Sequence, residues 1–311
     1  MRNKVAQIVF VLLALACLHP IVSSAVGLLL GIGFALIIEN PFPKESKHWS
    51  SRLLQISVIG LGGVMDFRVV ARVGLEGFGY TAIGISLTLL LGYLIGRSLR
   101  VSRDAATLIG SGTAICGGSA IAAVAPVIHA SAEDISVSLI IVFLLNAIAL
   151  LIFPTIGHHF HLTQHQFGLW AALAIHDTSS VVGASMQYGA QALEIATTIK
   201  LARALWIVPV AAAFAFFGAK SGSLSKIKKP WFILGFLIVA AIVTWIPATK
   251  PAGEMLAFAA RRVLVVTLFL IGSSLSRRAL KTVGAKPFVM GIVLWVCVAT
   301  ATLTAILQHW I

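Results

Sequence analysis

Residues 110–126 read GSGTAICGGSAIAAVAP, a run of small and polar residues between two apolar stretches long enough to span a lipid bilayer. In hydrocarbon, every backbone N–H and C=O group must find a partner within the protein. A glycine-rich break at membrane depth therefore persists only where it is buried or lines a cavity. A helix broken there exposes backbone N–H groups that can hold an anion. This run predicts the working site of the protein.

The composition predicts an all-α polytopic membrane protein. Of the 311 residues, 59% are hydrophobic and only 11% are charged, and the mean hydropathy is +1.00. Apolar runs between charged or proline-rich breaks predict about eleven transmembrane helices in a single transmembrane domain over residues 1–311. These runs lie near residues 5–18, 21–38, 52–65, 77–96, 104–128, 135–156, 166–188, 193–218, 231–247, 258–275 and 287–310. We expect the first of them to be an uncleaved span.

The formal net charge of +13 is explained by membrane topology and not by nucleic-acid binding. Most of the 23 Lys and Arg residues lie in short loops between apolar spans, and a cytoplasmic N-terminus puts most of them inside. The positive-inside rule then favours a cytoplasmic N-terminus and a C-terminus on the opposite side of the membrane.

The sequence gives no sign of a metal or a cofactor. Cys17, Cys116 and Cys297 are far apart and have no C-x-x-C spacing. No Walker A sequence is present, so ATP-driven transport by this chain alone is unsupported. We expect neither a cofactor nor a metal ion.

The segment near residues 104–128 contains the first group of candidate site residues. Its glycines allow close backbone approach or a positive φ, and its hydroxyl groups are hydrogen-bond donors. The substrate-binding candidates are Ser111, Gly112, Thr113, Cys116, Gly117, Gly118 and Ser119. The alternative is simple helix packing, because small residues are common where membrane helices touch.

The segment near residues 166–188 contains the second group. It places His176 and Asp177 within an apolar span, where ionisable residues are costly and mark function. We assign these two residues to proton or ion coupling. The hydroxyl residues that follow them, Thr178, Ser179 and Ser180, are further substrate-binding candidates. Alternatively, Asp177 is a helix N-cap, and this interpretation is compatible with the functional one.

Other polar residues allow two interpretations each. Lys200 and Arg203 lie three residues apart on one helical face, where they either neutralise Asp177 or bind an anionic substrate. Alternatively, Lys200 extends to the membrane interface and Arg203 pairs structurally with a carboxylate. Asn146 is expected to make an interhelical hydrogen bond. The sequence does not decide whether the loop histidines sense pH or are simply solvated; they are His158, His159, His161 and His165.

Two internal matches suggest repeats of the kind found in secondary transporters. GGVMDFRVVARVG from Gly62 can be aligned with GSSLSRRALKTVG from Gly272, and AICGGSAIA from Ala114 with AIHDTSSVV from Ala174. Their order along the chain is not that of a tandem duplication.

The segments GSGTAICGGSAIAAVAPVI and AIHDTSSVVGA resemble the signature of the YeiH-type family of bacterial inner-membrane proteins, which are described as sulfate exporters. The resemblance covers essentially the whole chain. It implies a bacterial inner (cytoplasmic) membrane and a fold related to cation:proton antiporters, with inverted repeats and two broken helices meeting near the bilayer midplane. The positions that it carries over are Gly112, Thr113, Cys116, Gly117, Gly118, Ser119, His176, Asp177, Thr178 and Ser179.

The leading hypothesis is therefore a secondary active transporter of a small inorganic or sulfonate anion, with H⁺ or Na⁺ as the coupling ion. Sulfate or sulfite is what the resemblance implies. The alternative is a cation:proton (Na⁺/H⁺) antiporter in which Asp177 binds Na⁺ or H⁺.

A third hypothesis is a membrane enzyme with Cys116 as nucleophile and His176 as base, but it requires an activated thiolate and a substrate entrance that the sequence does not show. We therefore expect no enzymatic activity. Besides the anion and the coupling ion, the expected partner is the lipid bilayer. The small residues are compatible with a homodimer, although none of them marks a dimer surface.

Overall fold

The computed structural model describes residues 2–217, 231–275 and 284–311, and within these ranges the elements are helices and turns without a strand. Each of the eleven expected segments overlaps one helix or two consecutive helices. The all-helical fold class is thereby confirmed.

Contacts divide the chain into two compact units that are both discontinuous in sequence. One consists of Met1–Arg72 and Pro230–Leu280, and the other of Val73–Lys229 and Lys281–Ile311. Each unit is described by itself. The single transmembrane domain expected over residues 1–311 stays a prediction.

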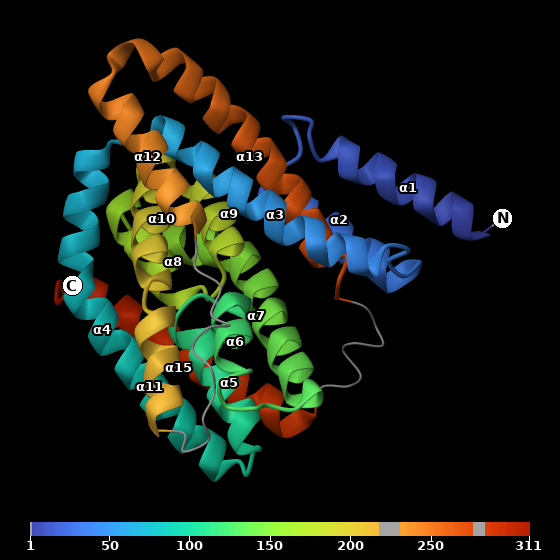
Figure 1. The fold of residues 1–311 in the computed structure, drawn as a ribbon, viewed down its shortest axis with the longest axis vertical. Coiled ribbons are helices and arrows are strands. Elements are labelled where there is room, and N and C mark those ends of the chain that lie inside the picture. Colours follow the sequence, from blue (N-terminus) through green and yellow to red (C-terminus); the bar gives the residue numbers. More distant parts are fainter. Residues whose placement is uncertain (1, 218–230, 276–283) are drawn as a thin grey trace. The chain divides into compact units, whose positions relative to one another are not determined.

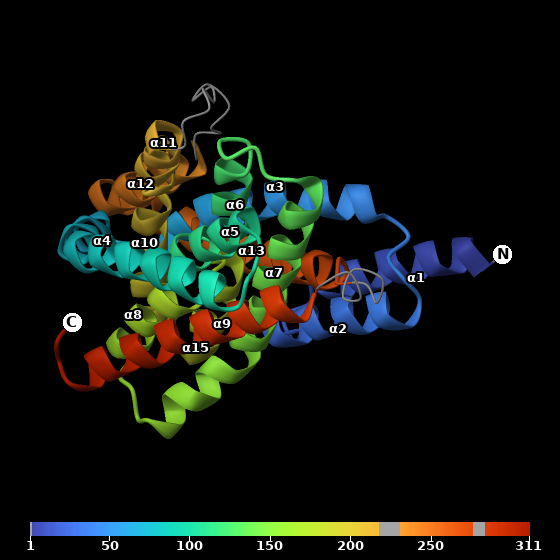
Figure 2. The ribbon, with the colours of Figure 1, turned by 90° about the horizontal axis from the view of Figure 1, so that it is seen from below.

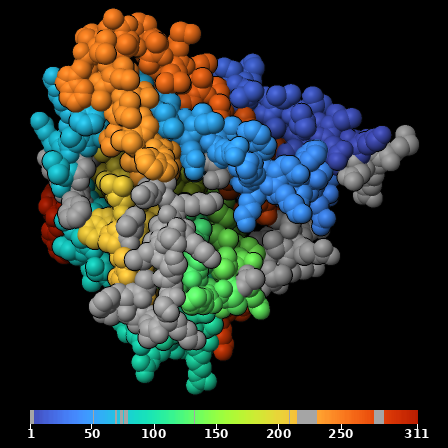
Figure 3. Space-filling view, in the orientation of Figure 1, coloured from blue at the N-terminus to red at the C-terminus, as the bar shows by residue number. Residues whose placement is uncertain are grey.

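The first unit is built around α13, which packs along α3 and α2 (Figure 1). Its elements are α1 (Arg2–Ala16), α2 (Ser24–Ile37), α3 (Pro43–Leu61), η1 (Gly62–Val64), α12 (Trp231–Trp245), η3 (Pro247–Thr249) and α13 (Lys250–Gly272). The ring of Phe10 on α1 contacts those of Phe34 and Phe269, with centroids 5.3 and 5.0 Å apart. Other residues of α1 are apolar and exposed, with Ile8 and Leu12 at about 60% exposure. In Figure 3, α1 is the dark blue segment at the surface.

Glycines let the helices of this unit approach at backbone distance. A Cβ atom on Gly31 of α2 would collide with the Phe269 carbonyl oxygen and lie 2.9 Å from the Ser273 amide nitrogen. A Cβ atom on Gly272 of α13 would lie 2.5 Å from the Leu28 carbonyl oxygen. Neither position has room for a side chain.

The second unit contains both glycine-rich and polar segments that the sequence singled out. Its elements are α4 (Phe67–Ser98, which begins in the first unit), α5 (Arg103–Ala114), α6 (Gly118–Val124), α7 (Ala132–His159), α8 (Gln164–Ala174), α9 (Thr178–Tyr188), α10 (Ala190–Ala204), α11 (Ile207–Phe217) and α15 (Ala285–Leu307). α8 is buried among α9, α10 and α15, and Figure 2 shows α15 running beside it. In the core of the second unit, the Phe153 ring stacks on the rings of Trp170 and Trp295.

Several helices have the length and composition of membrane spans. Within the described residues, five segments qualify by length and hydropathy: Gly79–Ser98, Glu133–His159, Ala190–Phe214, Pro247–Gly272 and Ala285–Leu307. On α4, Ile83, Leu87, Leu90 and Leu94 form an exposed apolar stripe of the kind that faces lipid. The chain is therefore a multi-pass helical membrane protein, whereas the count of eleven spans stays a prediction.

The boundaries differ most from expectation around α3 and α4. α3 begins at Pro43 and not near residue 52, and it includes the polar sequence KESKHWSSR. α4 begins at Phe67 and not near residue 77. Hydropathy alone placed both starts too late, because the charged first turns of a helix do not register as apolar. Proline is well suited to the first turn of α3, where an N–H group has no intrahelical partner.

The close approach at Gly31 predicts a position-specific cost. Gly31→Ala should lower the free energy of unfolding by about 1–3 kcal/mol, because the new methyl group meets backbone atoms that cannot move aside. The matched control is Gly33→Ala on the same helix, where a Cβ atom would meet nothing within 4 Å. Thermal unfolding in detergent measures both. Equal melting temperatures for the two variants would contradict the close approach of α2 and α13 at Gly31.

Candidate functional site

The second unit contains two helix breaks, and they lie at aligned positions of the two matching segments that begin at Ala114 and Ala174. α5 ends at Ala114 and α6 begins at Gly118, while α8 ends at Ala174 and α9 begins at Thr178. These residues are aligned when AICGGSAIA is placed on AIHDTSSVV. The expected breaks therefore lie where the sequence placed them.

The two breaks lie against each other. Gly117, the last residue of the first break, has a φ of +68°, which favours glycine. A Cβ atom at Gly117 would lie 3.5 Å from Cα and Cβ of Asp177, the last residue of the second break. The positive φ therefore favours glycine at this position, and the short distance places Gly117 against Asp177.

The two cations of α10 cap the carboxyl ends of α5 and α8. Lys200 Nζ donates to the carbonyl oxygens of Ile175 at 2.7 Å and Ala172 at 3.3 Å. Arg203 Nη1 donates to the carbonyl oxygen of Leu173 at 2.7 Å, and Arg203 Nε donates to that of Ala114 at 2.6 Å. Carbonyls at a helix end lack intrahelical donors and carry partial negative charge, so buried cations suit them.

Both side chains are deeply buried, with exposures of 0% for Lys200 and 2% for Arg203. The guanidinium group of Arg203 bonds to backbone on both sides of the site and so joins the two broken helices. Neither structural alternative holds as stated, because Lys200 is fully buried instead of reaching the interface and Arg203 bonds to backbone carbonyls in place of a carboxylate. Their suggested contact with substrate stays a prediction.

Asp177 caps the amino end of α9. Its Oδ2 accepts hydrogen bonds from the amide nitrogens of Ser179 and Ser180, at 3.0 and 3.2 Å, and from the Ser179 hydroxyl. The N-cap interpretation of Asp177 is confirmed. The aligned position in the other break is Gly117, which has no side chain, and α6 begins without a side-chain cap.

Asn146 of α7 holds the second break from the side. Its Oδ1 accepts hydrogen bonds from the amide nitrogens of His176 at 3.0 Å and Asp177 at 3.2 Å. Asn146 was expected to bond to another helix, but it bonds to the backbone between α8 and α9. Trp295 of α15 adds a bond from Nε1 to the Ala174 carbonyl oxygen at 3.2 Å. Sequence analysis missed Trp295, since nothing in its own apolar span marks it.

Several buried polar atoms near the breaks have no hydrogen-bond partner. His176 is 1% exposed, and neither of its ring nitrogens is bonded. The same is true of Asn146 Nδ2 and of the Ser111 and Thr113 hydroxyls on the last turn of α5. Buried polar groups without partners are rare in folded proteins, so these atoms are candidates for ligand contacts.

The remaining predicted residues differ in exposure. Gly112, Cys116, Thr178 and Ser180 are buried, Gly118 is partly buried and Ser119 is exposed. Cys116 lies close enough to Lys200, Asp177 and Arg203 to interact with their charges. First-break and second-break residues therefore share one electrostatic environment.

The histidine loop lies at the far end of α9 from the breaks. His158, His159, His161 and His165 are exposed, and the His158 ring stacks on Tyr188, the last residue of α9, at 4.4 Å. Whether these residues sense pH stays untested.

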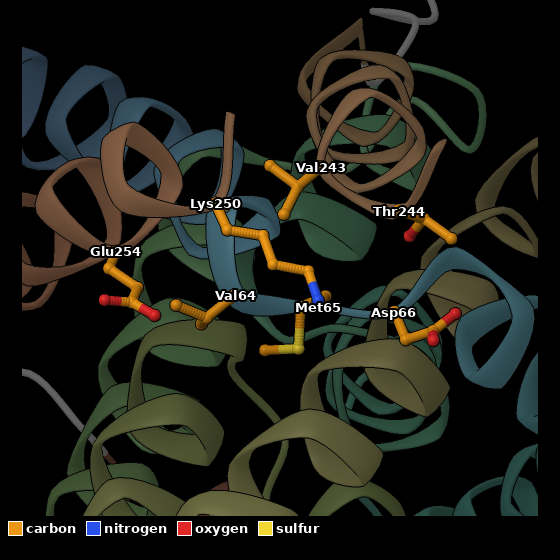
Figure 4. Close-up of a pocket in the computed structure, with 8 residues that line it drawn as sticks. Val64, Met65, Asp66, Val243, Thr244, Lys250 and Glu254 are labelled. Atoms are coloured by element: carbon orange, nitrogen blue, oxygen red, sulfur yellow. The ribbon is translucent and has the colours of Figure 1, made fainter. Parts of the chain in front are cut away.

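A surface hollow of about 260 Å³ in the first unit contains none of the predicted residues. Figure 4 shows the Lys250 side chain reaching across it toward Met65.

Comparison with known proteins shows the family. The family model described as conserved hypothetical protein 698 matches residues 5–291. The chain belongs to this family. It is 59% identical to a UPF0324 membrane protein of Bdellovibrio bacteriovorus over 100% of this chain and 97% of that relative.

Members of the UPF0324 family from distant bacteria match at nearly full length. A relative in Geobacter sulfurreducens is 46% identical over 97% of this chain and 96% of that relative. A relative in Bacteroides thetaiotaomicron is 48% identical over 92% of this chain and 86% of that relative. The resemblance to the YeiH-type family is thereby confirmed. No solved structure matches the chain.

The capping role of Lys200 predicts a loss of stability when its donors are removed. Lys200→Met keeps an unbranched side chain but leaves the Ile175 carbonyl without its donor, which should cost about 1–3 kcal/mol. Lys286→Met, at an exposed position of α15 in the same unit, is the control and should change stability little. Denaturation in detergent compares them. An unchanged stability of Lys200→Met would show that the carbonyls do not depend on this cation.

Proposed function

We propose that this protein is a secondary active transporter of a small anion in the bacterial inner membrane, with the N-terminus in the cytoplasm. The observation that carries the proposal is the buried charge at the helix breaks. Apart from cysteines, the buried ionisable side chains of the described residues are His176, Asp177, Lys200 and Arg203. Two cations and one carboxylate leave one positive charge when His176 is neutral and Lys200 is protonated.

An uncompensated charge in an apolar interior is unfavourable unless a counter-ion neutralises it. The helix ends do not remove the surplus, because each break contributes one negative carboxyl end and one positive amino end. A monovalent anion from solution does. The unpartnered Asn146 amide and the hydroxyls of Ser111 and Thr113 are donors that suit an oxyanion.

The anion class is proposed as a sulfur oxyanion such as sulfate or sulfite, or a sulfonate, on the strength of the family resemblance. Asp177 and His176 are the proposed proton-coupling groups, with Na⁺ as the other coupling ion considered. The substrate is carried unchanged, so the proposal contains no enzymatic step.

The antiporter alternative uses Asp177 as the cation ligand. Two features disfavour it. Asp177 Oδ2 already accepts three hydrogen bonds from Ser179 and Ser180. Lys200 lies close enough to Asp177 to interact with its charge, and a protonated Lys200 repels a further cation.

We also propose that the chain contains two repeats whose elements run in permuted order. The first is α2, α3, α4, α5/α6 and α7; the second is α8/α9, α10/α11, α12, α13 and α15. In this arrangement α2 corresponds to α12, and α3 corresponds to α13. The matched glycines at the ends of α3 and α13 make corresponding contacts. A Cβ atom on Gly62 would meet the Phe236 carbonyl oxygen of α12, and one on Gly272 would meet the Leu28 carbonyl oxygen of α2. Permutation explains why the sequence matches are not in tandem order. The inverted relation of the repeats, their meeting near the bilayer midplane and a homodimer remain expectations, and most of the segment after Gly272 lies outside the described residues.

Transport is tested directly in liposomes. Purified protein should drive uptake of labelled sulfate or sulfite under an imposed pH or Na⁺ gradient, and dissipating the gradient should stop it. Empty liposomes are the control. If no oxyanion moves under any gradient, the proposed function is wrong.

Neutralising Asp177 separates the anion and cation hypotheses. Asp177→Asn keeps an oxygen that accepts from Ser179 and Ser180 but raises the buried surplus to two positive charges. Thermal stabilisation by sulfite or sulfate should persist, because the variant site still binds anions. A bound ligand stabilises the folded state by RT ln(1 + [L]/Kd). Asp66→Asn, an exposed residue whose side chain accepts from the Arg68 amide, is the matched control. Loss of anion stabilisation in Asp177→Asn alone, together with loss of a wild-type Na⁺ response, would favour the antiporter.

A further inference from the structure

The unusual group in the site is the imidazole of His176. It is 1% exposed, neither ring nitrogen has a hydrogen-bond partner, and Asn146 Nδ2 beside the same break is also unbonded. The backbone amide of His176 is fixed by Asn146 Oδ1, so the ring starts from an anchored position. A buried imidazole on an anchored backbone, with two nitrogens that lack hydrogen-bond partners, is suited to bind a ligand.

The charges around the ring decide which form of the imidazole belongs there. Lys200 and Arg203 face it from α10, Asp177 follows it in the chain, and Cys116 of the other break lies within reach of the same charges. The side chains of α7 and α15 that hydrogen-bond to the backbone of this break, Asn146 and Trp295, are uncharged. An imidazolium would be a third cation against one carboxylate in a dry interior, which is costly. The neutral ring has one N–H donor and one nitrogen that must accept a hydrogen bond.

An anion without a hydrogen-bond donor leaves that accepting nitrogen unpaired. A dianion such as sulfate lacks the donor and also turns the surplus of one positive charge into one negative charge. A monoanion that retains a hydroxyl group matches both features, since its charge balances the site and its O–H donates to the ring.

We infer that the site selects the monoanion of an oxyacid that keeps one O–H group, with that hydroxyl donating to His176 and an anionic oxygen accepting from Asn146 Nδ2. Hydrogen sulfite and bicarbonate are members of this class. The inference rests on the proposed function and narrows its substrate from oxyanions in general to protonated monoanions.

The test uses pairs of anions with the same charge and shape in which a methyl group replaces the hydroxyl. Hydrogen sulfite is paired with methanesulfinate, and bicarbonate with acetate, at a pH where the protonated monoanions predominate. Thermal stabilisation of the purified full-length protein gives a Kd for each. In at least one pair the hydroxyl anion should bind more tightly by about tenfold or more, because a site built to hydrogen-bond a hydroxyl rejects the analogue that lacks it.

Two variants of His176 locate the selectivity. His176→Gln keeps a donor and an acceptor and should retain the preference for the hydroxyl anion. His176→Met has similar length but neither group, and should bind both members of a pair within about twofold. The wild-type comparison remains decisive if either variant fails to fold.

The outcomes separate this inference from the proposed function. If anions stabilise the protein but methyl and hydroxyl members bind equally, or sulfate binds best, the inference is wrong and anion transport stands. A preference that survives in His176→Met also overturns it. If none of the anions binds, the proposed function fails together with the inference.

Discussion

A helix that ends inside an apolar interior leaves its last carbonyl groups without partners, and this constraint organises the second unit. At the end of α8, the carbonyls of residues 172–175 accept hydrogen bonds from Lys200, Arg203 and Trp295. These donors lie on α10 and α15, so both helices must lie against the break. Arg203 also bonds to Ala114 at the end of α5 and ties the two breaks together. The same cations that satisfy the backbone give the site its positive charge.

The first amide groups of a helix also lack intrahelical partners, and the two breaks differ in how these amides are capped. α9 begins with the Asp177 carboxylate on its first amides, whereas α6 begins with Gly117, which brings no acceptor. Because aligned positions carry a carboxylate in one break and no side chain in the other, the site is asymmetric despite the similarity of the two segments. One consequence is the surplus of positive charge on which the proposed anion selectivity depends.

The first unit meets the demands of an apolar environment without breaking helices. Its glycines bring backbones into contact, as between α2 and α13 at Gly31 and Gly272, so packing there relies on close approach and not on buried charge. Around the breaks of the second unit, several buried polar atoms have no hydrogen-bond partner, including both ring nitrogens of His176.

Local sequence specifies most of the helical segments and the places where two of them break. Apolar run length depends on local composition, and the break at Ile175–Asp177 has a local cause, since Asp177 caps the helix that follows it. The tertiary structure alone decided what Lys200 and Arg203 do and that Asn146 and Trp295 serve the same break. Arg203 donates to a carbonyl 89 residues away. Backbone groups freed by a broken helix are satisfied by whichever side chains the fold brings near, and no local pattern records that neighbour.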